Sequence, residues 1–138
     1  MSDQTPKVSD KIKERLPQFV LRPRDIVFGR KGAIDRNSIV NKNQSGWFLG
    51  SDGIRLRLSE NIDSLFVSYQ LRCSTIGKWL LQNSSGSVMP SLNQKTLNRL
   101  PLWLPSSNEQ QNISTVLSAL DKKIELNNLI NAELEAMA

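Results

Sequence analysis

The side chains best suited to chemistry in this sequence are basic, and Asn and Gln accompany them. Lys and Arg bind phosphates with release of counterions, while Arg, Lys, Asn and Gln on loops can read base edges. Because these types gather around predicted turns and along one predicted strand, they indicate nucleic-acid binding. The alternative is that the surplus charge only aids solubility. The candidate contact residues are Arg30, Lys31, Arg36, Lys42, Gln44, Arg55, Arg57, Gln94 and Lys95.

The composition excludes most catalytic and metal-binding chemistry. The 138 residues include no histidine, so no Ser–His or Cys–His pair, imidazole base or histidine-bearing zinc site can form. The single cysteine, Cys73, allows neither an internal disulfide nor a thiolate cluster, and we expect it to be a small buried filler. The carboxylates are scattered singly, and no glycine-rich phosphate loop is present. We therefore predict no catalytic residue, no metal site and no cofactor.

The charge divides the chain into two parts. Residues 1–100 carry 16 basic and 8 acidic side chains, a net charge of +8, whereas residues 101–138 carry 2 basic and 5 acidic ones, a net charge of −3. A basic body and a mildly acidic tail suggest two surfaces with different partners. No signal peptide and no stretch of ~20 apolar residues is present. We expect a soluble, cytoplasmic chain of one domain's size that does not bind a membrane.

The basic body has the pattern of a small mixed α/β domain. Strands are predicted over residues 24–29 and 33–40, and a half-buried strand over 54–58, where apolar residues alternate with Arg55 and Arg57. From Asp63 the period becomes helical, which predicts a helix pair broken near Ser74 or Gly77. The sequence then predicts a short helix capped by Asn93. The proline-bounded segment 100–105 is expected to be extended at a sheet edge.

The last thirty residues predict one long helix. Ser106 and Glu109 fit a capping box, with Ser107 as the alternative cap. Apolar residues and two asparagines follow a 4-3 spacing, which is typical of a coiled-coil seam. A second apolar stripe lies on another face, so the helix needs a partner helix; the alternative is a helix folded back on its own body. The seam is Ile113, Leu117, Leu120, Ile124, Asn127, Asn131, Leu134 and Ala138, and the second stripe is Leu126, Leu129, Ile130 and Met137.

Three segments, taken in order, resemble one known family. The first is residues 24–34, RDIVFGRKGAI; the second is residues 86–93, GSVMPSLN; the third begins at Leu104 and includes LSALDKKIELNN at residues 117–128. Each segment is short, but the ordered set resembles the specificity subunits of Type I restriction–modification systems. The resemblance covers about residues 20–138.

This resemblance implies a non-catalytic subunit that reads one half of a split target in double-stranded DNA. It implies an α/β target-recognition domain over residues 1–105, lacking its front portion, and a conserved spacer or dimerisation helix over 106–138. In the family, this helix pairs with a matching helix and docks the adenine-methylating modification subunit, and through it the restriction subunit. The second segment adds Ser85 and Ser87 to the candidate DNA contacts.

The chain departs from the family in its size. Family members usually hold two recognition domains and two long helices, whereas this sequence has one basic body and one helix. We expect a fragment, a truncated gene product or a half-sized subunit, which would pair with a second recognition domain or with its own copy. The alternative function is a helix-mediated assembly module with little DNA binding of its own.

Overall fold

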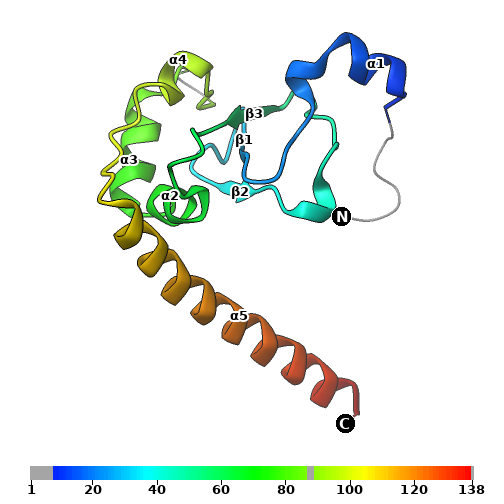
Figure 1. Ribbon diagram of the computed structural model, residues 1–138, viewed down its shortest axis with the longest axis vertical. Helices are drawn as coiled ribbons and strands as arrows, with labels where there is room; N and C mark the ends of the chain where they lie inside the picture. Colours follow the sequence, from blue (N-terminus) through cyan, green and yellow to red (C-terminus); the bar gives the residue numbers. More distant parts are fainter. Residues whose placement is uncertain (1–7, 87–88, 138) are drawn as a thin grey trace.

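The computed structural model describes residues 8–86 and 89–137, which form a small body with one long helix leaving it (Figure 1). This arrangement confirms the predicted mixed α/β fold with a long C-terminal helix. In chain order the elements are α1 (Asp10–Arg15), the 3-10 turn η1 (Pro17–Phe19), β1 (Ile26–Gly29), β2 (Asn37–Ile39), the 3-10 turn η2 (Lys42–Gln44), β3 (Gly53–Leu56), α2 (Ser64–Leu71), α3 (Ser74–Asn83), α4 (Gln94–Leu97) and α5 (Ser107–Met137).

The described residues form an antiparallel sheet of three strands in the order β2-β1-β3. In the register of β1 and β3, Ile26 pairs with Leu56 and Val27 pairs with Arg55. Because side chains alternate along a strand, Ile26 and Phe28 lie on the inner face, where both are buried. Val27 and Arg55 lie on the outer face, so the sheet has one apolar and one polar face.

All three strands are shorter than the sequence predicts. β1 covers Ile26–Gly29 rather than 24–29, because Arg24 has a φ of +76°, outside the extended region. β2 covers Asn37–Ile39 rather than 33–40, because the chain turns at Gly32, whose φ of +78° lies in the left-handed region. β3 ends at Leu56 rather than at residue 58, because β1 begins at Ile26 and offers it no further partner. Arg57 therefore lies just beyond the strand.

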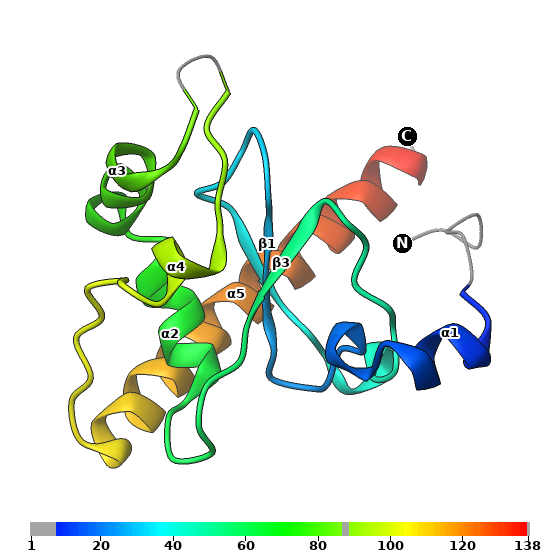
Figure 2. The ribbon, with the colours of Figure 1, turned by 90° about the horizontal axis from the view of Figure 1, so that it is seen from above.

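Helices α2 and α3 bury the inner face of the sheet (Figures 1 and 2). The predicted helix pair is confirmed, and its break falls at Arg72 and Cys73. Cys73 is exposed, so the prediction of a buried filler is wrong; it occupies the N-cap position of α3, at the corner between the helices. The core cluster consists of Ile26, Phe28, Ile34, Ile54, Phe66, Val67, Leu71, Ile76, Leu80, Leu92 and Leu97.

The segment between α4 and α5 is extended, as predicted, but it does not lie at a sheet edge. Its backbone is held by a side chain of α2 instead. The Trp103 N–H donates to Gln70 Oε1 at 3.2 Å, and Gln70 Nε2 donates to the Trp103 carbonyl at 2.9 Å. The side-chain amide thus takes the place of a neighbouring strand, which satisfies these backbone groups without a ladder.

Helix α5 begins with the predicted capping box. Ser106 Oγ accepts the Glu109 N–H at 3.4 Å and donates to the Glu109 carboxylate at 2.6 Å. The first turns pack on α2, where Gln110 and Ser114 are buried, but residues 121–137 are all exposed. The alternative of a helix folded back on its own body is therefore wrong for the second half of α5. None of the helices in the described part of the chain has the length and apolarity that crossing a membrane requires.

Candidate nucleic-acid interface

The structure joins two loops that are more than fifty residues apart in the sequence. The loop after β1 carries Arg30 and Lys31, and the loop after α3 carries Ser85. The Leu92 N–H donates to the Arg30 carbonyl at 2.8 Å, and Lys31 forms a backbone bridge with Ser91. Ser85 and Ser91 exchange two backbone hydrogen bonds, of 3.0 and 2.7 Å. Two segments that the sequence singled out separately thus form one surface.

Glycines set the shape of these joined loops. Gly32 has a φ of +78° and its N–H donates to the Pro90 carbonyl at 3.2 Å. Gly86 has a φ of +99°, and a Cβ at this position would collide with the Met89 carbonyl oxygen. Both positions therefore require glycine for backbone reasons. Arg30 is further held by its N–H, which donates to the Asp52 carbonyl at 2.7 Å.

Several other predicted contact residues lie on the loops or helix attached to this surface. Arg36 is exposed in the β1–β2 turn, while Gln94 and Lys95 are exposed on α4, which follows Leu92 directly. Gln94 Nε2 donates to Asn98 within α4, at 3.1 Å. Ser87 lies outside the described residues.

Lys42 and Gln44 lie elsewhere. Both belong to η2, which follows β2, and antiparallel pairing places this turn at the start of β1 rather than at its end. Lys42 is exposed, whereas Gln44 is half-buried and its Oε1 accepts the Asn41 N–H at 2.9 Å. The structure therefore does not bring these two residues together with Arg30.

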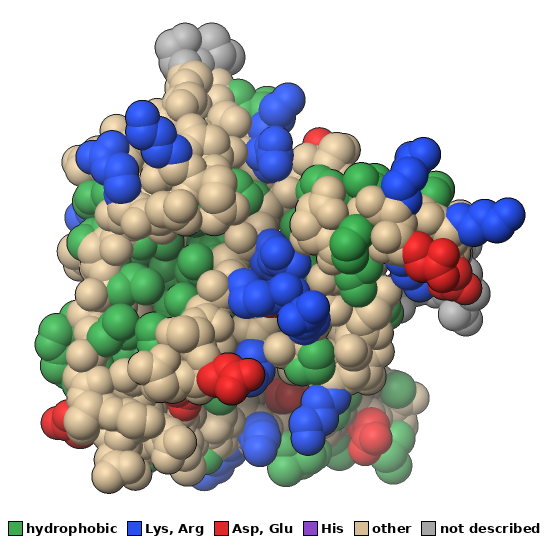
Figure 3. Space-filling model, turned by 45° about the horizontal axis from the view of Figure 1, so that its top comes forward, with side chains coloured by type: hydrophobic (Ala, Val, Ile, Leu, Met, Phe, Trp, Pro, Cys, Tyr) green, Lys and Arg blue, Asp and Glu red, His purple; other side chains and the backbone are tan. Residues whose placement is uncertain are grey.

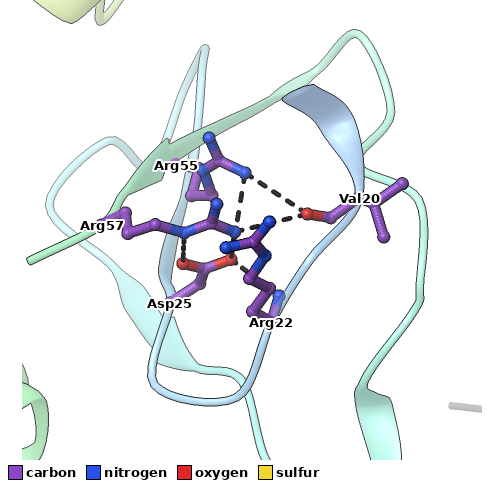
Figure 4. Close-up of polar contacts among 5 residues, drawn as sticks. All are labelled: Val20, Arg22, Asp25, Arg55 and Arg57. Carbon is purple, nitrogen blue, oxygen red and sulfur yellow. Dashed lines mark hydrogen bonds and ion pairs between the residues drawn. The ribbon is translucent and has the colours of Figure 1, made fainter. Parts of the chain in front are cut away.

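Arg55 and Arg57 surround a carboxylate that the sequence analysis missed (Figure 4). Asp25 is 1% exposed and receives Arg57 Nε and Nη2, both at 2.6 Å. Arg55 Nη1 lies 4.0 Å from the same carboxylate and donates to the Val20 carbonyl at 3.3 Å. The hydrogen bond to Asp25 raises the pKa of Arg57, whereas burial, followed by the charge of Arg57, lowers the pKa of Arg55.

No spacing rule could have found this cluster from the sequence. Asp25 and Arg57 are 32 residues apart and meet only because β1 and β3 pair in a particular register. The sequence offered a weaker signal. Residues 1–100 hold 8 acidic and 16 basic side chains, and Asp25 is the one acidic residue inside the strand predicted over residues 24–29.

Basic side chains gather on one face of the molecule. Figure 3 shows Lys and Arg side chains in a band down the middle of this face, with few acidic side chains beside them. A surface of this kind attracts a polyanion and neutralises its phosphates. No group of three or more His, Cys, Asp or Glu residues within 8–86 and 89–137 is arranged to hold a metal ion.

The predicted helix seam is largely uncovered in this chain. Leu120, Ile124 and Leu134 are 54%, 58% and 59% exposed, and Ile113 is 37% exposed. Leu117 is half-buried, while the two seam asparagines, Asn127 and Asn131, are exposed; Ala138 lies outside the described residues. The second stripe is exposed as well, with Leu126, Leu129, Ile130 and Met137 between 44% and 83%.

Comparison with models of known protein families shows to which family this chain belongs. The model of the Type I restriction modification DNA specificity domain matches residues 1–136. The chain belongs to this family. The resemblance stated from the sequence is thereby confirmed, and the family is the specificity component of these systems rather than a catalytic one.

One related sequence and one related crystal structure match parts of this specificity domain. The Type I restriction enzyme MjaIX specificity subunit of Methanocaldococcus jannaschii is 35% identical over 79 residues, which cover 57% of this chain and 18% of that protein. The crystal structure of an HsdS subunit from Thermoanaerobacter tengcongensis matches with a TM-score of 0.65 at 19% identity, over 83% of this chain and 30% of that one. The chain thus spans less than a third of either relative.

A buried polar joint fixes helix α5 to the body of the specificity domain. Asp63, the N-cap of α2, accepts the Leu65 N–H at 2.8 Å and the Ser114 hydroxyl at 2.6 Å. Its own N–H donates to Gln110 Oε1 at 3.0 Å, and Gln110 Nε2 donates to the Pro105 carbonyl at 2.8 Å. The sequence analysis missed this joint.

A second contact reinforces the joint about two turns beyond Ser114 along α5. Asp121 accepts the Tyr69 hydroxyl at 2.9 Å and lies 3.5 Å from Arg72 Nη1. The direction of α5 is thus defined relative to the loops described above.

Proposed function

We propose that this chain recognises one half of a split target sequence in double-stranded DNA, as the specificity component of a Type I restriction–modification complex. The observation that carries the proposal is the pairing of the two motif loops, because it presents Arg30, Lys31 and Ser85 on one surface of a DNA specificity domain. Loop side chains of these types bind phosphates and base edges.

The proposal divides the chain into a DNA-reading body up to residue 105 and an assembly helix from residue 106. The helix pairs with the helix of a second recognition domain or of a second copy. It also docks the modification (methyltransferase) subunit, which brings the restriction subunit into the complex. The support is the exposure of two apolar stripes on α5, because large apolar side chains in contiguous exposed patches mark interaction sites. A coiled coil is the packing that the 4-3 spacing favours.

Salt-dependent DNA binding tests the first part of the proposal. The full chain is titrated with duplex DNA at several salt concentrations. Wild type should give a steep negative slope of log affinity against log salt, and the double variant Arg30→Ala, Lys31→Ala should reduce that slope by about two if both side chains contact phosphate. Arg15→Ala with Lys11→Ala, on α1, is the matched control and should leave most of the slope unchanged. A flat wild-type slope would contradict DNA recognition.

A second candidate function is an assembly module that pairs or docks through α5 and binds DNA weakly. It is favoured by the same exposed apolar stripes on α5. Co-purification with a modification subunit, together with DNA affinity that does not depend on sequence, would select this function over the first.

A further inference from the structure

The outer face of the sheet carries more positive charge than its one buried carboxylate can neutralise. Arg22, Arg55 and Arg57 lie around Asp25 (Figure 4). Among the described residues, no carboxylate other than Asp25 lies within 4.0 Å of the Arg55 and Arg57 guanidinium groups. Three arginines therefore share one carboxylate, which leaves a surplus of two positive charges.

The three arginines differ in how they contact the Asp25 carboxylate. Arg57 forms a bidentate pair with Asp25, with both distances at 2.6 Å. Arg55 is 4.0 Å from the carboxylate, and Arg22 meets it through its backbone N–H, at 2.8 Å. The ion pair with Asp25 needs only Arg57, so the charges of Arg22 and Arg55 are in excess of that pair, although Arg55 also donates to the Val20 carbonyl at 3.3 Å.

The surplus charge is unfavourable in the free protein. Burial lowers the pKa of Arg55, and the charges of Arg57 and Arg22 add to this effect, whereas Asp25 opposes it. A second anion at the cluster would relieve the repulsion. The cluster is also open to such an anion, since the Arg57 and Arg55 side chains are 33% and 20% exposed while Asp25 is 1% exposed and lies beneath them.

We infer that Arg22 and Arg55, positioned beside the Asp25–Arg57 pair, bind one phosphate of the DNA backbone. Guanidinium groups are suited to this because they donate several hydrogen bonds in a fixed geometry and stay charged. Arg57 and Asp25 are positioning residues in this account. The inference rests on the proposed function, since it names the contact that orients the duplex while the loops at the other end of β1 read it.

The spacing along β1 suits a duplex that lies across both clusters. Asp25 and Gly29, the residue before Arg30, are four positions apart along the chain, which corresponds to about 13 Å at ~3.3 Å per residue. DNA advances ~3.4 Å per base pair along each strand, so the two basic clusters are about four base pairs apart. The phosphate bound at the Asp25 cluster therefore lies to one side of the bases that Arg30 and Lys31 reach.

The test combines protein and DNA variants, using the full chain and a duplex selected from a random pool. Arg22→Gln and Arg55→Gln remove the two surplus charges and leave the Asp25–Arg57 pair in place, so the fold is retained; Arg15→Gln on α1 is the matched control. Each cluster variant should lower affinity about five- to tenfold at 0.1 M salt and reduce the salt slope by about one. Arg15→Gln should change neither.

A neutral methylphosphonate, placed at each phosphate of the duplex in turn, locates the contact. One position should weaken wild type, weaken Arg22→Gln less, and have no further effect on the double variant Arg22→Gln, Arg55→Gln, because the double variant has already lost both contacts to that phosphate. If wild type binds its selected duplex but both cluster variants match Arg15→Gln, the phosphate site is wrong and the proposed function stands. If wild type shows no preferred sequence, the proposed function itself fails. Binding of inorganic phosphate without any effect on DNA affinity would indicate a free-anion site and overturn the inference.

Discussion

At the scale of single residues, Asp25 links folding to the basic surface. Its carboxylate is buried, pairs with Arg57 in two hydrogen bonds and also accepts the Arg22 N–H. A buried carboxylate of this kind is tolerated only because its partners satisfy it. The same pair holds arginine side chains on the outer face of the sheet, so one residue contributes to both stability and charge placement.

Asp25→Ala should lower the free energy of unfolding by roughly 2–4 kcal/mol. The change leaves two arginines without a counter-charge and one backbone N–H without its acceptor; partial exposure of the arginines keeps the loss below that of a fully buried pair. Urea unfolding followed by circular dichroism measures the effect. Asp35→Ala, at an exposed aspartate of the same body, is the control, and an equal loss in both variants would contradict the role of Asp25.

The second prediction for a single residue concerns the replacement of Gly86. Its φ of +99° and the Met89 carbonyl oxygen leave no space for a side chain, so Gly86→Ala should destabilise or rearrange the loop after α3, at a cost of about 1–3 kcal/mol. Gly50→Ala is the matched control, because no atom would lie within 4 Å of its Cβ. The free energy of unfolding and the DNA affinity should both fall in Gly86→Ala and stay unchanged in Gly50→Ala. Identical behaviour of the two variants would show that the loop tolerates a Cβ.

At the scale of elements, local signals were readable from the sequence and long-range ones were not. The caps formed by Asn93 and Ser106 involve partners three residues away, and both were predicted from residue type and spacing. The joint between Asp63 and Ser114 spans 51 residues. It depends on how α5 packs on α2, which no periodicity encodes.

The candidate site follows the same division. Residue types alone placed Arg30 and Lys31 at a turn, and the resemblance added Ser85. Their juxtaposition depends on the backbone bridges between the two loops, to which the side-chain pattern contributes nothing. Arg55 and Arg57 were expected side by side on the polar face of a strand, and the register of β1 with β3 also places Asp25 beneath them.

A further prediction concerns the pairing of helix α5 with a partner helix. Leu120→Asp places a charge on the seam that we propose to be a pairing surface, and it should weaken pairing by several kcal/mol, on the order of the cost of burying an unpaired charge. Sedimentation of the full chain at micromolar concentration, alone and with a modification subunit, measures the loss. Because Leu120 is 54% exposed in this chain, the melting temperature of the body should not change.

Ala132→Asp is the control for this experiment, because it adds the same charge at an exposed position of α5 that belongs to neither apolar stripe. It should leave pairing nearly intact. A wild-type chain that remains monomeric and binds no modification subunit would contradict the proposed role of the helix. So would equal effects of the two substitutions, since pairing would then not depend on the seam.

At the scale of the whole molecule, the charge is divided between the body and the C-terminal helix. The net charge of +5 combines +8 on residues 1–100 with −3 on residues 101–138, and the contacts of Asp63 with Ser114 and of Asp121 with Tyr69 join these two parts. A rigid joint matters for a specificity subunit, because the helix would set where the reading surface lies on the duplex.

The central claim is that the body reads DNA sequence, and selection from a random duplex pool tests it most directly. The full chain, with a modification subunit present in a parallel sample, is taken through several rounds of selection at 0.15 M salt. The account predicts enrichment of one short motif, with each mismatched base pair costing about 1–3 kcal/mol and with enrichment reduced for the variant Arg30→Ala, Lys31→Ala. A pool that stays random in both samples, or a motif that the double variant selects equally well, would contradict it.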